Sequence, residues 1–76
     1  MATIQVYKHG TSTLLGTGDG TIDSKAGTAR INSWTDKAGL VVDTNYALKS
    51  AGKTYSDATC TTVNAVAPVA TFDNVS

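Results

Sequence analysis

The chain has 76 residues with six acidic and six basic side chains, so its formal net charge is zero. It lacks the basic stripe with which proteins attract nucleic acid or an anionic membrane surface. No window approaches the roughly 20 apolar residues of a membrane-spanning helix. We therefore expect one domain, residues 1–76, with neither nucleic acid nor a membrane as partner. Because the N-terminus has no basic stretch followed by an apolar one, we also expect a protein that is made in the cytoplasm and not secreted.

The composition favours strands over helices. Thirteen residues are threonine and none is glutamate. Threonine is β-branched and suits a pleated strand, whereas glutamate is common in surface helices. Leu, Ile, Val and Phe together number only fifteen, and the single cysteine, Cys60, excludes an internal disulfide. A small domain with so thin a core is marginally stable, so we expect support from copies of itself or from a larger surface.

The N-terminal third of the chain predicts a hairpin. Apolar and polar residues alternate over Ala2–His9, and a second apolar run follows at Ser12–Leu15. A turn around His9–Thr11 would connect two strands. The glycine-rich run Gly16–Gly20 is expected to break the second strand, which leaves Thr21–Asp23 as a short strand at best.

The middle of the chain predicts a meander. Ala-Gly pairs recur at intervals of 12 and 13 residues, and glycine supplies the positive φ that tight turns need. Between these turns, Thr28–Thr35 and Leu40–Thr44 are expected to be strands. Strict alternation places Trp34 on the same face as Arg30 and Asn32.

Residues 44–50 admit two interpretations. A short helix over Thr44–Ser50 would be capped by Thr44 and ended by Gly52. Alternatively, Leu40–Leu48 would pair with Lys53–Val63 as a hairpin. The β-propensity of the surrounding sequence favours the hairpin.

The C-terminal part is expected to be extended over Thr59–Phe72. Pro68 cannot donate a hydrogen bond to a sheet, which predicts an edge strand or an arm. Residues 61–76 are therefore a candidate extended arm, with Asp73–Ser76 loose at its end. The whole chain predicts an all-β fold: a small sandwich or partly open barrel of five or six short strands with an extended C-terminal segment.

Two segments are similar to phosphate-binding loops, and both are interpreted as turns. Ala47–Thr54 lacks the leading glycine, and the helix that should open at Lys53 is not indicated. Gly16–Gly20 lacks the spacing of the dinucleotide fingerprint and carries Asp19, which would repel phosphate. We expect no cofactor.

Catalytic and metal-binding groups are sparse. Asp19 and Asp23 supply too few oxygen ligands for calcium, which takes about six to eight. His9 and Cys60 are each unique and would be the only nucleophile–base pair. We expect His9 at an exposed hairpin tip and Cys60 as a small buried residue of a strand. Neither a catalytic residue nor a metal site is therefore predicted.

The expected interface consists of aromatic and C-terminal apolar residues. Trp34 is its first member, because its strand neighbours Arg30 and Asn32 are polar and tryptophan is enriched at interfaces. The other expected members are Tyr7, Val66, Pro68, Val69 and Phe72.

The Ala/Thr/Gly/Val/Asn-rich, Glu-poor and Cys-poor composition, together with the hairpin sequence Thr3–Thr11, resembles small structural proteins of tailed bacteriophages. It is most similar to capsid cement (decoration) proteins. The resemblance implies a β-rich subunit, often trimeric, that sits on the capsid surface where capsomers meet. Such a subunit binds the major capsid protein or another virion protein and reinforces the shell without catalysis. Residues 61–72 or the N-terminal strand would pair with the shell protein by strand addition.

Two other functions remain open from the sequence. One is a phage tail or baseplate component. The other is a monomeric carbohydrate- or ligand-binding module that uses Trp34 and the tyrosines as a stacking platform. A binding module should expose a flat aromatic pair, whereas an assembly protein should expose an unpaired strand or an apolar patch.

Overall fold

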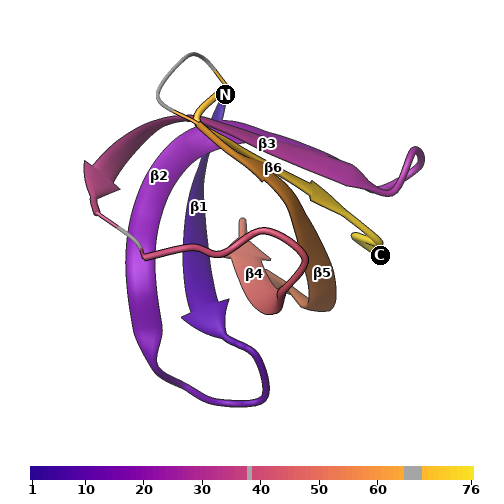
Figure 1. Cartoon of the computed structure of the whole chain (residues 1–76). Helices are drawn as coiled ribbons and strands as arrows, with labels where there is room; N and C mark the ends of the chain where they lie inside the picture. The colour runs from indigo at the N-terminus through magenta and orange to yellow at the C-terminus, as the bar shows by residue number, and fades with distance from the viewer. Residues whose placement is uncertain (38, 65–67) are drawn as a thin grey trace.

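The computed structural model describes residues 1–37, 39–64 and 68–76 (Figure 1). Its strands are β1 (Ala2–Lys8), β2 (Leu14–Asp23), β3 (Thr28–Asp36), β4 (Asn45–Ser50), β5 (Lys53–Val63) and β6 (Ala70–Asp73). Every pairing is antiparallel, and the strands close into a barrel in the order β1-β2-β3-β6-β5-β4. The described residues include no helix that is long and apolar enough to cross a membrane. The all-β prediction is confirmed, and the barrel is closed rather than partly open.

The barrel consists of two three-stranded meanders. The N-terminal half contains β1, β2 and β3, and the C-terminal half contains β4, β5 and β6; residues 37–44 connect them. The halves meet along two seams. The β1–β4 seam pairs Gln5–Lys8 with Tyr46–Lys49, and the β3–β6 seam pairs Ala29–Ile31 with Ala70–Phe72.

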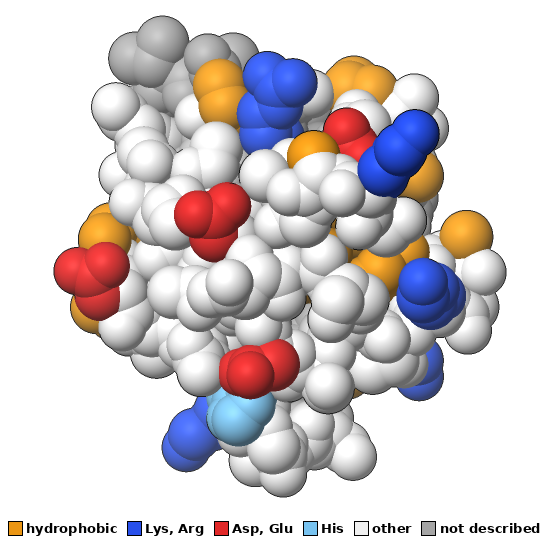
Figure 2. Space-filling model, turned by 90° about the vertical axis from the view of Figure 1, so that its right-hand side faces the viewer, with side chains coloured by type: hydrophobic (Ala, Val, Ile, Leu, Met, Phe, Trp, Pro, Cys, Tyr) orange, Lys and Arg blue, Asp and Glu red, His pale blue; other side chains and the backbone are white. Residues whose placement is uncertain are grey.

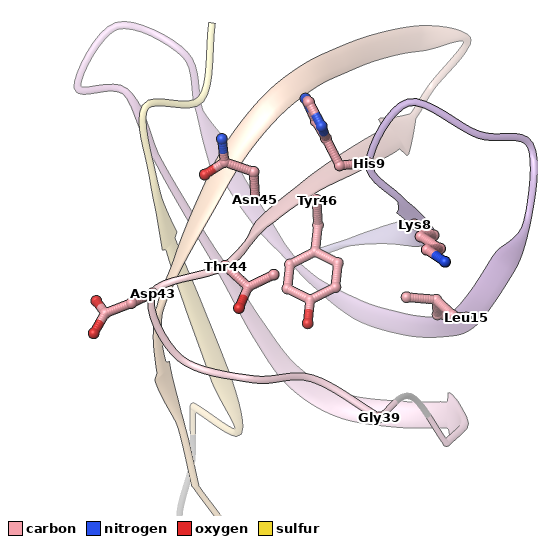
Figure 3. Close-up of a pocket in the computed structure, with 8 residues that line it drawn as sticks. All are labelled: Lys8, His9, Leu15, Gly39, Asp43, Thr44, Asn45 and Tyr46. Carbon is pink, nitrogen blue, oxygen red and sulfur yellow. The ribbon is translucent and has the colours of Figure 1, made fainter.

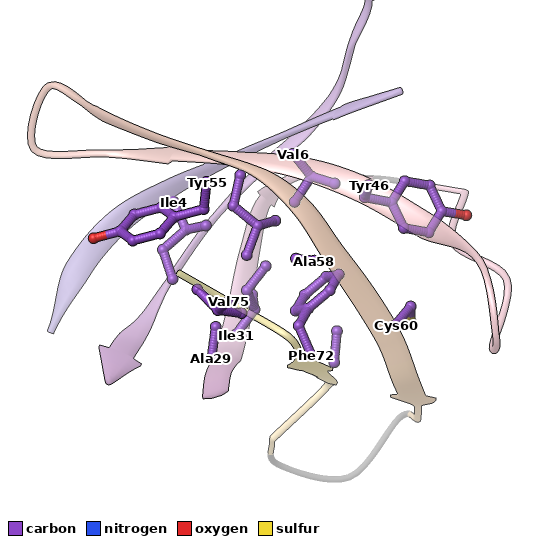
Figure 4. Close-up of a cluster of buried hydrophobic side chains, with 12 residues drawn as sticks. Ile4, Val6, Ala29, Ile31, Tyr46, Tyr55, Ala58, Cys60, Phe72 and Val75 are labelled. Atoms are coloured by element: carbon purple, nitrogen blue, oxygen red, sulfur yellow. The ribbon is translucent and has the colours of Figure 1, made fainter. Parts of the chain in front are cut away.

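The core lies inside the barrel and draws on both halves (Figure 4). Alternation along β1 buries Ile4 and Val6, as the sequence pattern predicts for a strand. Among the described residues, Phe72 is the largest side chain that is fully buried; it is 1% exposed and meets the ring of Tyr46 edge to face, with centroids 6.4 Å apart. Edge-to-face packing is a favourable aromatic geometry. The other buried hydrophobic residues of this core are Ala29, Ile31, Leu48, Tyr55, Ala58, Cys60, Ala70 and Val75.

The glycine-rich run does not break β2, which continues through it to Asp23. Gly18 and Gly20 are buried and stand where β3 approaches most closely. A Cβ on Gly18 would lie 2.6 Å from the carbonyl oxygen of Ser33, and one on Gly20 would overlap the carbonyl oxygen of Arg30. The expectation of a break is wrong because these glycines permit close backbone approach within a strand.

A bulge in the pairing of β2 with β3 changes the face on which Trp34 lies. Asp19 pairs with Ser33 and Gly20 with Ile31, so Asn32 is an extra residue in β3. Trp34 therefore stands opposite the buried Gly18 and packs against the core. The prediction that Trp34 shares a face with Arg30 and Asn32 is wrong, because a bulge shifts the alternation by one residue.

The C-terminal segment is part of the barrel and not an arm. Strand β6 lies between β3 and β5, and Val75 is buried beyond it with its N–H donating to the carbonyl of Gly27 at 3.1 Å. The expectations of an arm over residues 61–76 and of a loose end over residues 73–76 are therefore wrong for their described residues. Pro68 misled the sequence analysis, because it precedes β6 and so removes no donor from that strand.

The hairpin interpretation of residues 44–50 is confirmed, with β4 pairing with β5 around Ala51–Gly52. Both turn residues have positive φ, 52° and 78°, as a two-residue hairpin turn requires. The phosphate-loop-like segment is thus a hairpin with its turn. Residues 40–44, expected to be a strand, precede β4 as a loop.

Candidate functional site

An open cleft of about 690 Å³ lies beside the segment that connects the two halves. We call it the loop cleft. Its lining comes from the end of β1, the start of β2, the connecting segment and the start of β4 (Figure 3). The lining residues are Lys8, His9, Leu15, Gly39, Asp43, Thr44, Asn45 and Tyr46. A cleft of this volume is in the range of ligand pockets, 300–1,000 Å³.

Tyr46 lies at the centre of the loop cleft, with its ring directed toward the connecting segment (Figure 3). The ring is 5% exposed, and its hydroxyl accepts a hydrogen bond from the N–H of Val41 at 2.9 Å. Alternation along β4 explains this placement, because Tyr46 and Leu48 both face inward. Tyr46 thus joins the barrel core to the loop.

The second part of the connecting segment is fixed to β5. The N–H of Asp43 donates to the carbonyl of Cys60 at 2.8 Å, and the N–H of Cys60 donates to the carbonyl of Thr44 at 2.9 Å. Asp43 has a φ of 64°, a left-handed conformation that aspartate tolerates better than most residues. The loop from Val41 to Thr44 is therefore anchored to the C-terminal half.

This anchored loop displays two apolar side chains. Val41 is 63% exposed and Val42 is 42% exposed, whereas Leu40 packs against the core. Exposed valines on a loop that is fixed by hydrogen bonds form an apolar tip with little freedom to fold inward. We call Val41 and Val42 the valine tip.

A chain of polar side chains leads away from the cleft over the outer surface. His9 Nε2 lies 3.4 Å from Asp57 Oδ1, which also accepts a hydrogen bond from Asn45 Nδ2 at 2.8 Å. Asn45 Oδ1 accepts from Thr59, and Thr59 Oγ1 accepts from Asn74, both at 3.0 Å. Figure 2 shows the histidine against a carboxylate, on a face that is mostly uncharged polar surface with scattered apolar side chains. These contacts hold the β1–β2 turn and the C-terminus against the C-terminal half.

The groups that could carry out chemistry are not assembled into one site. Cys60 is buried in the core, and this burial raises the pKa of its thiol above the ordinary value of 9.0. Its thiol lies 3.8 Å from the carbonyl oxygen of Thr62 as a weak donor, whereas His9 pairs with Asp57 on the surface. Within the described part of the chain, no group of three or more His, Cys or Asp side chains could hold a metal. What the loop cleft can provide for a ligand is a hollow with apolar side chains and hydrogen-bond donors in its lining.

The predicted interface residues are dispersed by the fold. Tyr7 is half-buried on the outside of β1, its hydroxyl donating to Gln5 at 3.3 Å and its ring 5.9 Å from Lys49 Nζ. Pro68 and Val69 are half-buried, and Val69 N–H donates to Ile31 at 2.7 Å.

Phe72 is in the core, so its assignment to the interface is wrong. It lies there because β6 is an interior member of the closed order and not an edge. Trp34 is half-buried and packs against the core, and Val66 lies outside the described residues.

The valine tip is not among the residues predicted from the sequence. Leu40-Val41-Val42 is an apolar run with two β-branched residues, which a local pattern assigns to the interior of a strand. Glycine immediately before it and Asp43 immediately after it are the turn signals that would have indicated a displayed loop.

The comparisons with known proteins assign no relative. The chain matches no protein-family model, no curated protein and no solved structure. Function is therefore argued from the geometry and from the composition alone.

Proposed function

We propose that the chain is a non-catalytic structural subunit of a viral particle, a capsid cement protein that binds and stabilises the shell. The observation that carries the proposal is the valine tip, two exposed apolar side chains on an anchored loop. Apolar side chains that water surrounds in the isolated protein gain free energy when a partner covers them, at about 25 cal/mol per Å². The composition that resembles cement proteins supports the same role.

The proposed attachment differs in mechanism from strand addition. In a closed barrel each strand has a neighbour on both sides, so a long free edge for a partner strand is not offered. Side-chain contacts by the valine tip replace it. Each contact area is small, and repetition over the shell would supply the avidity. A trimer of subunits, which the resemblance implies, would present three tips together.

The proposal is tested by binding to particles from which the chain has been stripped. Val42→Asp is expected to lower the bound amount at least tenfold, because it places a charge where an apolar contact forms. The matched control is Val63→Asp, since Val63 has nearly the same exposure, 41%, but stands at the end of β5. Equal binding by both variants and the unchanged protein would contradict docking through the valine tip.

A second candidate is a small ligand-binding module, which the loop cleft favours. Trp34 and the tyrosines do not form the stacking platform expected for carbohydrate, because Tyr46 and Tyr55 are buried and Trp34 packs against the core. Ligand binding in the cleft would instead use Tyr46, Leu15 and the Lys8 ammonium. Val42→Asp leaves the residues that line the cleft in place, so it separates the two functions.

A further inference from the structure

We infer that two copies of this chain can exchange their C-terminal halves. Each barrel then contains the N-terminal half of one copy and the C-terminal half of the other. This inference goes beyond the proposed function and does not rest on it. It starts from the topology. Every strand is hydrogen-bonded to its sequence neighbour within its own half, and one covalent connection, residues 37–44, joins the halves.

The surfaces that would be exchanged are those that already hold the barrel together. The β1–β4 seam has four residue pairs and the β3–β6 seam has three. Each half is a curved sheet whose apolar residues face inward: Ile4, Val6 and Ile31 belong to the N-terminal half, and Tyr46 and Phe72 belong to the C-terminal half (Figure 4). Without the complementary half, the apolar face of each three-stranded sheet would be exposed to water. The half of a second copy fits this surface with identical contacts.

The hydrogen bonds of the connecting segment show where its attachment to the C-terminal half begins. Val41 is bonded to Tyr46, and Asp43 and Thr44 are bonded to Cys60, so the connection from Val41 onward belongs to the C-terminal half. The exchange would therefore change the path of the chain only before Val41, the part of the connection that we call the hinge. Apart from its chain neighbours, Gly39 has no atom within 4 Å of the place where a Cβ would stand, so there is open space beside this position.

Concentration and hinge length decide between the two arrangements. The contacts are the same in both, so the monomer is favoured by the effective concentration of a tethered half, which is in the millimolar range for short linkers. The exchanged form is favoured when the protein itself reaches that concentration, or when the hinge is too short to fold back. A subunit held at high local density on a surface meets the first condition.

Disulfide trapping tests the exchange in the full-length chain. Gln5→Cys and Lys49→Cys face each other across the β1–β4 seam, and Thr3→Cys and Asp19→Cys face each other within the N-terminal half. Directly opposed residues of antiparallel strands are within disulfide reach. Each cysteine pair is introduced into a chain that also carries Cys60→Ala. The two proteins are unfolded, refolded at about 10 μM or about 1 mM, and then oxidised.

The seam pair is expected to give covalent monomers at the low concentration and covalent dimers or larger rings at the high one. The control pair should give monomers at both. A seam pair that bonds only within one chain at both concentrations overturns the inference, and so do dimers of the control pair, which would indicate non-specific association.

A hinge deletion provides a second measurement. Removing residues 37–40 takes away about 14 Å of chain reach and joins Asp36 directly to Val41. The inference predicts a protein of at least twice the monomer mass by light scattering, with the strand content retained. A folded monomer contradicts it. If the shortened chain does not fold, the disulfide readout decides.

Discussion

Gly20 stands at the closest approach of two strands, where even one methyl group has no room. Its missing Cβ would overlap the carbonyl oxygen of Arg30, which belongs to the backbone and cannot rotate away. Gly20→Ala is therefore expected to lower the free energy of unfolding by about 3 kcal/mol, the upper part of the range for overpacking. Urea denaturation measures the change.

Gly39→Ala is the matched control for Gly20→Ala. A Cβ at Gly39 meets no atom within 4 Å, so its stability should stay within about 0.5 kcal/mol of the unchanged protein. Similar midpoints for the two variants would show that β2 and β3 do not approach as closely as described.

Cys60 links stability to alkaline pH. Burial raises the pKa of its thiol in the folded state, so above pH 9.0 the unfolded chain releases this proton while the folded chain retains it. The thiol's contribution to stability is complete below that pH and is lost as pH rises toward the folded pKa, with a limiting slope of about 1.4 kcal/mol per pH unit.

The alkaline effect is isolated by comparing two chains. Urea unfolding at pH 7.5 and pH 10 should show a larger loss of stability for the unchanged protein than for Cys60→Ala. Only the difference between the two pH values matters, because the alanine variant also loses core volume. Parallel losses in both proteins would refute the assignment to this thiol.

At the scale of elements, the hydroxyl of Tyr46 holds the connecting segment at Val41. Tyr46→Phe removes the acceptor for the N–H of Val41 and leaves the ring in the core. We expect stability to fall by about 1 kcal/mol, the usual net worth of a hydrogen bond. The amide of Val41 should exchange with deuterium faster. Tyr7→Phe serves as control, because its hydroxyl bonds a side chain on the outer surface. Equal exchange at Val41 in both variants would disprove the role of Tyr46.

Local pattern was sufficient for some elements and misleading for others. The β1–β2 hairpin and the inward alternation of Ile4 and Val6 follow from neighbours in sequence. The continuity of β2 through Gly18 and Gly20 does not, because it depends on the backbone of β3. The face of Trp34 depends on a bulge at Asn32, which no periodicity reveals.

At the scale of the whole molecule, strand content was predictable and closure was not. The seams join residues that are about 40 positions apart, Gln5 with Lys49 and Ala29 with Phe72, and composition carries no signal for such pairs. The segment predicted as an arm contains β6, because its pairing with the distant strand β3 cannot be read from the local sequence. Of the interface residues predicted from the sequence, Tyr7, Trp34, Pro68 and Val69 are partly accessible among the described residues. The valine tip is recognised only once the fold is known.

The proposed function makes the chain a regular component of a particle, and counting its copies in purified particles tests this proposal most directly. Particles are isolated on a density gradient from cells that express the chain, and its copies are quantified by mass spectrometry against the major shell protein. We predict a fixed ratio that does not change between preparations or after a salt wash that removes loosely bound proteins. A chain that is absent from the particles, or present in a ratio that varies with washing, would contradict a structural role.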